Sequence, residues 1–176
     1  MTTSQQSPQT AVARRSAEVE LRGLVARFAP EHQRLVGTVR RWLRKHLPAA
    51  HEMVYEYRDS FVISYSPNER GYEGLIAIRA GADGVDLYFN RGTELPDPGK
   101  LLRGSGKQTR LIHVEGASTL AQPAVARLVD EAIARNRVPF ACVGRGPVVI
   151  RSTSAQQRRR AESQSPHQSG SNNRSL

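Results

Sequence analysis

The sequence has few of the residues that cross-link a chain, insert it into a membrane or stack on nucleic-acid bases. Its single cysteine, Cys142, excludes an internal disulfide, which suits a reducing cytoplasm. No apolar run approaches the ~20 residues of a membrane-spanning helix, and the first residues lack the apolar core of a signal peptide. Aromatic residues make up only 6% of the chain. We therefore expect a cytoplasmic protein with no membrane partner.

The positive charge is concentrated near the two ends of the chain. The formal net charge is +10, but residues 17–150 hold 19 Lys/Arg and 15 Asp/Glu, a net charge of only +4. The end segments are polar and aperiodic, so they bury too little apolar surface to offset the entropy of ordering them. We expect a disordered leader over 1–16, one folded domain over 17–153 and a disordered basic tail over 154–176.

Apolar residues at helical spacing predict three helices. The first is expected over 17–28, with Ser16 as its N-cap. The second is expected from Pro30 to Pro48, because proline is favoured in the first turn of a helix and cannot continue one. The third is expected over 123–136. The second helix carries a long apolar stripe that we assign to the core: Leu35, Val36, Val39, Trp42, Leu43 and Leu47.

Between the second and third helices the apolar period changes to two, which is typical of strands with one buried face. A tight hairpin is expected at 80–84, and a further apolar run near the C-terminus favours an edge strand. The expected strands are 53–57, 61–65, 75–79, 85–89, 111–114 and 148–151. The fold class is therefore α+β, with an antiparallel sheet of about five strands packed against two N-terminal helices and one C-terminal helix.

One motif gives a family resemblance. The pattern L-x-D-P-x-x-L-L-x-G-x-G-K-x-x-R is formed by Leu95, Asp97, Pro98, Leu101, Leu102, Gly104, Gly106, Lys107 and Arg110. With the strand before it and the helix after it, the motif resembles the YdhG-like family of domains of unknown function, over roughly residues 21–136. The resemblance implies the fold given above. Some members of that family are described as frataxin-like iron chaperones, so iron is the one cofactor that the resemblance implies.

The glycine-rich centre of this motif is a candidate anion site. It is not a nucleotide-hydrolysing phosphate loop, because Gln108 follows the lysine and the next expected element is a strand. Glycines let a ligand approach the backbone closely, and neighbouring basic side chains can bind a negatively charged ligand. The alternative is a tight turn with solvated basic residues. The candidate residues are Arg103, Gly104, Ser105, Gly106, Lys107, Arg110 and His113.

A corner between the second helix and the first strand is a weaker candidate, for a metal. Iron prefers hard oxygen ligands or imidazoles, and the corner holds His46, His51, Glu52 and Glu56. The two glutamates lie four apart, so a straight strand places them on one face. Against this hypothesis, the spacing matches no standard metal motif, and ordinary surface charge explains the same residues.

The basic side of the second helix is a weak candidate for nucleic acid. It carries Arg34, Arg40, Arg41, Arg44 and Lys45, and the tail adds Arg158, Arg159 and Arg160. Such residues track phosphates, although a solvated helix face is the alternative. Cys142 lies in an apolar run and is predicted to be a small core residue, not a nucleophile.

These patterns favour a non-enzymatic binding protein over an enzyme. The leading hypothesis is a small module that binds an anionic ligand or a protein partner in a pocket between sheet and helices. The first alternative is iron delivery, implied by the resemblance only. The second is weak, non-specific binding of nucleic acid.

Overall fold

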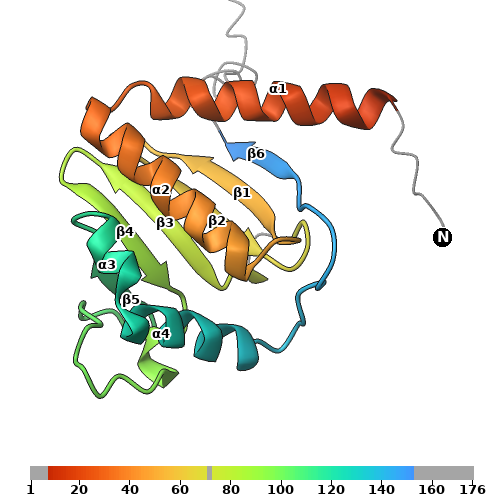
Figure 1. Ribbon diagram of the computed structural model, residues 1–176. Helices are drawn as coiled ribbons and strands as arrows, with labels where there is room; N and C mark the ends of the chain where they lie inside the picture. Colours follow the sequence, from red (N-terminus) through yellow and green to blue (C-terminus); the bar gives the residue numbers. More distant parts are fainter. Residues whose placement is uncertain (1–7, 71–72, 153–176) are drawn as a thin grey trace, which may run out of the picture.

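The computed structural model of the chain describes residues 8–70 and 73–152, and it has an α+β fold (Figure 1). Within these residues a six-stranded sheet is accompanied by four α-helices, and a short 3-10 helix follows the fourth strand. In chain order the elements are α1 (Pro8–Val25), α2 (Pro30–His46), β1 (His51–Glu56), β2 (Ser60–Ser66), β3 (Ile76–Gly81), β4 (Gly84–Phe89), η2 (Gly92–Glu94), β5 (Arg110–His113), α3 (Ala117–Ala121), α4 (Pro123–Ala134) and β6 (Val148–Ser152).

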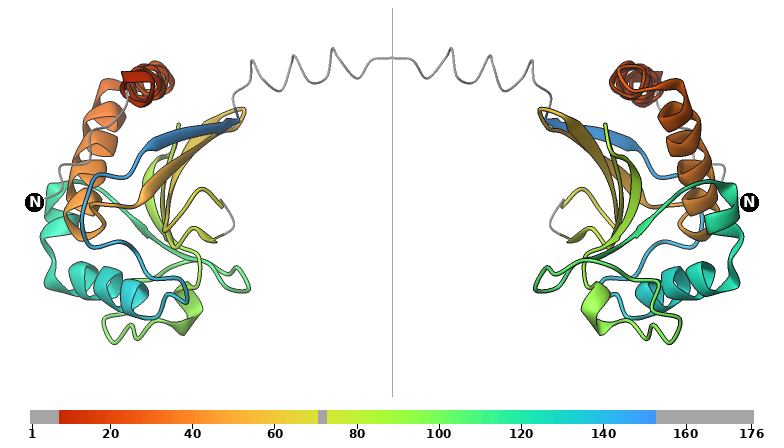
Figure 2. Two further views of the ribbon diagram at one scale, coloured as in Figure 1. Left: turned by 90° about the vertical axis from the view of Figure 1, so that its right-hand side faces the viewer. Right: turned by 90° about the vertical axis from the view of Figure 1, so that its left-hand side faces the viewer.

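The strand order across the sheet is β5-β4-β3-β2-β1-β6. The first five strands form an antiparallel meander, as the sequence predicts, and the hairpin between β3 and β4 is tight, with Gly81 paired to Gly84. The helices gather on one side of the sheet, which Figure 2 shows edge-on. In the part of the chain that the structure describes, most of the other sheet face therefore has no helical cover.

The prediction of a purely antiparallel sheet was wrong at its last strand. After β5 the chain passes through α3 and α4 and returns at the opposite edge, where β6 runs parallel to β1. The two strands enter the sheet side by side, since Gly146 N–H donates to Pro48 O at 3.1 Å and Glu52 N–H donates to Pro147 O at 2.9 Å. An apolar run predicts a strand but not the direction in which the strand runs. The run at 148–151 therefore does not say whether β6 is parallel or antiparallel to β1.

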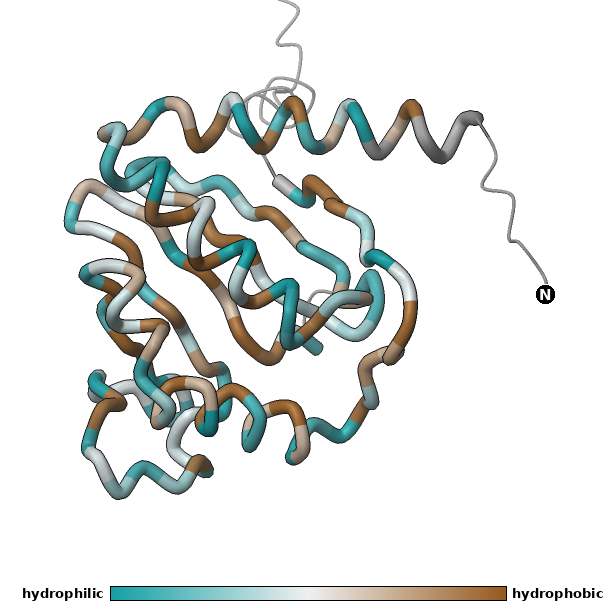
Figure 3. The backbone as a smooth tube through the Cα atoms, viewed as in Figure 1, coloured by the Kyte–Doolittle hydropathy of each residue, from teal (hydrophilic) through white to brown (hydrophobic). Residues whose placement is uncertain are grey.

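The core lies between the helices and the covered face of the sheet. Val36, Val39 and Leu43 are the buried residues of α2, at the spacing of one helix face. They meet fully buried strand residues such as Phe61 and Ile78. Figure 3 shows apolar segments alternating with polar ones along α2 and the strands. Each such side chain stabilises the fold by about 1.5–3 kcal/mol through its removal from water.

The predicted first helix begins too late. α1 starts at Pro8, so Ser16 lies inside it rather than at its N-cap, and it ends at Val25. The sequence of the leading half of α1 contains few large apolar residues, and periodicity therefore gives no signal there. α3 escapes prediction for a similar reason, because five residues are too few to show a helical period. The predicted basic tail, including Arg158, Arg159 and Arg160, lies outside the described residues, as do residues 1–7.

Candidate functional site

A buried carboxylate on β1, that of Glu52, lies at the centre of a network of charged side chains. Glu52 is only 1% exposed, and Tyr65, its cross-strand neighbour on β2, donates its phenolic O–H to Glu52 Oε1 at 2.9 Å. Two arginines one turn apart on α2 reach down to the same carboxylate. Arg40 donates from Nη2 to Oε2 at 2.6 Å, and Arg44 donates from Nε to Oε1 at 3.0 Å and also from Nη2 to Oε2. The carboxylate is thus fully satisfied despite its burial.

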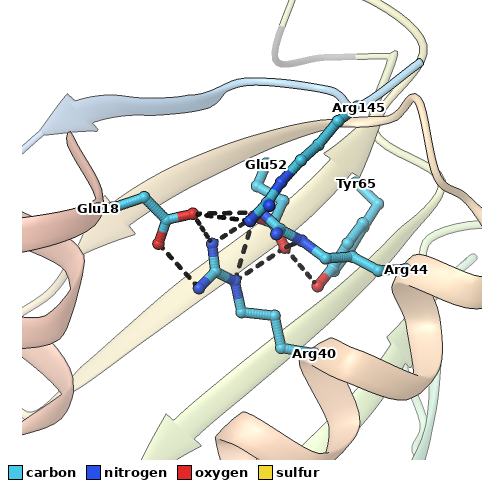
Figure 4. Close-up of polar contacts among 6 residues, drawn as sticks. All are labelled: Glu18, Arg40, Arg44, Glu52, Tyr65 and Arg145. Carbon is cyan, nitrogen blue, oxygen red and sulfur yellow. Dashed lines mark hydrogen bonds and ion pairs between the residues drawn. The ribbon is translucent and has the colours of Figure 1, made fainter. Parts of the chain in front are cut away.

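The same arginines connect the carboxylate to α1 (Figure 4). Arg40 makes a two-pronged contact with Glu18, donating at 3.0 Å to Oε2 and at 2.8 Å to Oε1. Arg44 Nη2 donates to Glu18 Oε1 at 3.4 Å. Planar guanidinium groups suit such forked geometry, which a lysine cannot reproduce. Because Glu18 lies on α1 and Glu52 on β1, the arginines of α2 join three elements through one charge network.

The network sets the protonation of its members. Burial acts to raise the pKa of Glu52, but hydrogen bonds from Arg40 and Arg44 outweigh it and hold the pKa below its ordinary value. The pKa of Glu18 is lowered in the same way, with burial opposed chiefly by Arg40. Burial raises the pKa of Tyr65 well above its ordinary value, and the nearby Glu52 charge adds to the effect. Both carboxylates are therefore ionised at neutral pH, and the phenol is neutral.

A second buried carboxylate on β1 repeats the arrangement on a smaller scale. Glu56 is 2% exposed and accepts a hydrogen bond from Arg27, in the connection between α1 and α2. The prediction that Glu52 and Glu56 share one face of a strand is consistent with this geometry. Both point to the helical side, and both receive arginines from it.

Beside the network a cleft opens between α1 and the strand β6. Its volume is about 450 Å³, which lies within the range of small-molecule sites. One wall is a single face of α1, carrying Arg15, Glu18 and Arg22 together with Val19. The other wall consists of Arg145, Gly146, Pro147 and Val148. The cleft thus combines apolar patches with three arginines.

The cleft carries an excess of positive charge. Its one acid, Glu18, is already bound by Arg40, while Arg145 Nη2 lies at 3.7 Å from Glu18 Oε1 with its side chain 72% exposed. Among the described residues, Arg15 and Arg22 form no ion pair. Arg40 and Arg44 already balance Glu18 and Glu52, so the long Arg145–Glu18 contact leaves the cleft with an excess of positive charge among the described residues.

The predicted anion loop is built differently from a ligand cradle. Arg110 Nη1 donates to Gly106 O at 2.6 Å and to Thr109 O at 2.8 Å, so its guanidinium holds the loop itself. The Asp97 carboxylate accepts the backbone N–H groups of Leu101 and Leu102 at 3.0 and 2.7 Å. These residues of the motif therefore have a structural explanation. The remaining candidates of the loop are exposed: Arg103, Gly104, Ser105 and Lys107. Gly104 has a φ of 107°, a backbone conformation that favours glycine.

His113 does not join that loop. Its Nδ1 lies 2.8 Å from Asp86 Oδ1, on the neighbouring strand β4, and Asp86 in turn contacts Arg79 at 3.3 Å. The residues predicted as one anion site are thus divided between an exposed loop and a separate His–Asp pair.

The predicted metal corner is not formed. Glu52 and Glu56 are bound by arginines, and His46 Nδ1 lies 3.1 Å from Asp130 of α4. His51 precedes Glu52 on β1, so the two side chains point to opposite faces of the sheet. Across residues 8–70 and 73–152, no group of three or more His, Cys, Asp or Glu side chains is placed to hold a metal ion.

The basic residues predicted to share one side of α2 lie on two different sides of it. Arg40 and Arg44 turn inward to Glu52, whereas Arg34, Arg41 and Lys45 are exposed. The hydrophilic side chains of an amphipathic helix are usually solvated, and α2 departs from this rule because Arg40 and Arg44 bind Glu52 on β1 and Glu18 on α1.

Cys142 is also placed differently from its prediction. It is exposed, and its neighbour Val143 is 86% exposed. The apolar run that contains them lies in the irregular connection between α4 and β6, and within it Phe140 packs on the core. An apolar run in a connection has no period that assigns its residues to an inward face.

Comparison with models of known protein families, with curated proteins and with solved structures gave no match to this chain. The resemblance to the YdhG-like family therefore stays a prediction. Over the part of the chain that the structure describes, no helix is long and apolar enough to cross a membrane. The fold and the site together define an α+β protein with an arginine-lined cleft beside a buried charge network.

Most of the cleft could not be predicted from the sequence. Arg15, Glu18 and Arg22 recur at the spacing of one helix face. Arg145 stands between two glycines, which often mark a close approach of backbones. Neither pattern alone shows that α1 and β6 lie side by side.

Proposed function

We propose that the chain is a non-enzymatic binding module for a small organic anion, with its site in the cleft between α1 and β6. The observation that carries the proposal is the cleft of about 450 Å³ with three arginines, of which Arg15 and Arg22 form no ion pair among the described residues and Arg145 reaches only Glu18, at 3.7 Å, an acid that Arg40 already binds. Guanidinium groups bind carboxylates and phosphates through paired hydrogen bonds. Such a site differs from the Gly-Ser-Gly loop, whose Arg110 is occupied by backbone carbonyls.

The walls of the cleft specify the kind of anion. Val19, Pro147 and Val148 add apolar surface to the arginines, so a ligand with a carboxylate or phosphate and a compact apolar part fits better than an inorganic ion. Binding sites of this type combine a mostly apolar lining with a few polar anchors. The buried network holds the walls in place, because Glu18 is part of both.

The first test is thermal unfolding of the full chain with inorganic phosphate, citrate, phenyl phosphate and hexanoate. A ligand that binds the native state raises the unfolding midpoint by mass action. We expect phenyl phosphate or hexanoate to raise it more than inorganic phosphate does. The shift should be lost in the double variant Arg22→Gln/Arg145→Gln.

A matched double variant separates the cleft from the loop. Arg103→Gln/Lys107→Gln removes two exposed positive charges from the Gly-Ser-Gly loop, and we expect it to keep the shift. A shift that disappears in the loop variant and survives in the cleft variant would move the site to the loop. Equal shifts in all variants would mean non-specific charge screening, and the proposal would be wrong.

The two alternatives have less support from the geometry. Iron delivery would need carboxylates that are open to a metal, whereas Glu52 and Glu56 are bound by arginines. Nucleic-acid binding would use the exposed Arg34, Arg41 and Lys45, a set smaller than the sequence suggested because Arg40 and Arg44 face inward.

A further inference from the structure

A second surface feature lies on the far side of α2 from the charge network. A groove of about 300 Å³ runs between α2 and α3. Its apolar lining is Trp42 and Leu120 together with the small residues Ala117 and Ala121, and Arg41 and Lys45 flank it. Trp42 is the one tryptophan of the chain and is half-buried, with its ring centroid 4.5 Å from that of His46. Tryptophan and arginine are among the residues most enriched at the energetic centres of protein interfaces.

The cations around this groove lack acidic partners. Arg41 and Lys45 are four residues apart and exposed, and Arg34 lies two turns earlier on the same side. Among the described residues none of the three forms an ion pair with a carboxylate; Arg41 donates only to Thr38 Oγ1 at 3.2 Å. Their neighbours Arg40 and Arg44 each contact two carboxylates. One helix thus carries a saturated cationic face and an unsaturated one.

Charge decides which occupant fits. Residues 153–176 of this chain contain four arginines and one glutamate, and residues 1–7 contain no charged side chain, so neither complements the groove. Nucleic acid would be expected to use exposed aromatic rings as stacking surfaces, whereas the Trp42 ring lies against His46 and is half-buried. An acidic peptide matches both the unpaired cations and the apolar lining of the groove. Its carboxylates would pair with Arg41 and Lys45, and an apolar side chain would enter the groove.

We propose that the α2–α3 groove binds a short acidic peptide segment of a protein partner, in a helical conformation. Apolar side chains spaced three or four residues apart enter the groove over Trp42, and carboxylates on the flanks of the segment pair with Arg41 and Lys45. A volume of about 300 Å³ accommodates one or two large side chains, so the affinity is moderate and depends on the charges. This site is independent of the anion cleft and shares no residue with it.

The test uses random peptides, so the partner need not be identified first. A phage library of random 16-residue peptides is selected on the full chain, and the enriched peptides are synthesised. They should be acidic and carry apolar residues at helical spacing. Their binding is followed by the fluorescence of Trp42, the single tryptophan. The double variant Arg41→Glu/Lys45→Glu should weaken the dissociation constant at least ten-fold.

The control keeps the same change in net charge. Arg58 and Arg137 are exposed, lie away from the groove and form no ion pair in the described part of the chain. Arg58→Glu/Arg137→Glu should bind the selected peptides within two-fold of the unchanged chain. Circular dichroism checks that both variants are folded.

Three results would overturn the proposal. The first is a selection that enriches no acidic sequences. The second is binding that the Arg41→Glu/Lys45→Glu variant leaves unchanged, or that the control variant loses equally. The third is an oligothymidine that changes Trp42 fluorescence through Arg41 and Lys45 more strongly than any selected peptide does, which would assign the face to nucleic acid.

Discussion

Arg145 Nη2 lies 3.7 Å from Glu18 Oε1, on a carboxylate that Arg40 already binds with two hydrogen bonds. The chain therefore places a largely exposed arginine beside an acid whose charge is already balanced. A similar excess is repeated by Arg15 and Arg22 on the same cleft. This contact between the buried network and the open cleft underlies the proposed anion site. The contribution of the network to stability is therefore tested first.

The buried carboxylate is expected to be essential for stability. Glu52→Gln keeps the shape of the side chain but leaves Arg40 and Arg44 without their main counter-charge. Removing one partner of a buried ion pair costs about 3 kcal/mol or more, so the free energy of unfolding measured with urea should fall by that amount. Glu20→Gln, an exposed change on α1, should alter it by less than about 0.5 kcal/mol. A loss equal to that of the control would contradict the account.

Stability should fall in acid through the same two carboxylates. The pKa values of Glu18 and Glu52 are lowered in the folded state from an ordinary value of 4.5. Their stabilisation is thus fully present above pH 4.5 and is lost as the pH falls through the lower folded values, because the unfolded chain then takes up protons first. Urea unfolding over the acidic range up to neutral pH should show this loss. The free energy of unfolding should fall less steeply with decreasing pH in Glu52→Gln than in the unchanged chain. An equally steep fall would assign the acid sensitivity to other groups.

Gly146 should tolerate no side chain. A Cβ at this position would lie 1.8 Å from Ala50 O and 2.7 Å from Ala49 O, both rigid backbone atoms. Gly146→Ala must therefore separate the entry of β6 from that of β1, and we expect a loss of about 2 kcal/mol or more in unfolding free energy.

Gly23→Ala is the matched control for that change. Apart from its chain neighbours and the backbone of its own helix, no described residue has an atom within 4 Å of a Cβ at Gly23, and Gly23 is exposed within α1. Alanine has the higher helix propensity, so this variant should gain about 0.5–1 kcal/mol. Equal effects of the two substitutions would contradict the placement of β6 beside β1.

Cys142 should react with thiol reagents in the folded protein. Its exposure in the α4–β6 connection predicts that a maleimide labels the native chain at a rate similar to that in denaturant, with one added mass per chain. Circular dichroism should not change on labelling. Strong protection in the native state would restore the core position that the sequence pattern suggested.

The parts of the fold that follow from local periodicity could be predicted from the sequence. Pro30 opens α2, Pro123 opens α4, and the meander from β1 to β5 agrees with the alternating pattern. The hairpin at Gly84 is marked by its glycine, which has a φ of 123°. The direction of β6 could not be predicted, because strand polarity depends on the path of a long connection.

The site was less predictable, because polarity in the sequence does not say which way a side chain points. Arg40 and Arg41 are neighbours and equally basic, yet one binds buried Glu52 and the other faces water. The four-residue spacing of Glu52 and Glu56 predicts one shared face of a straight strand, and the structure is consistent with it. That both carboxylates are buried beneath arginines could be recognised only from the fold.

The most direct test of the central claim is a calorimetric titration of phenyl phosphate into three forms of the full chain. The forms are the unchanged protein, Arg22→Gln/Arg145→Gln and Arg103→Gln/Lys107→Gln. The account predicts saturable binding to the unchanged protein and to the loop variant, with at least ten-fold weaker binding to the cleft variant. Undiminished binding to the cleft variant, or no saturable binding to the unchanged protein, would contradict it.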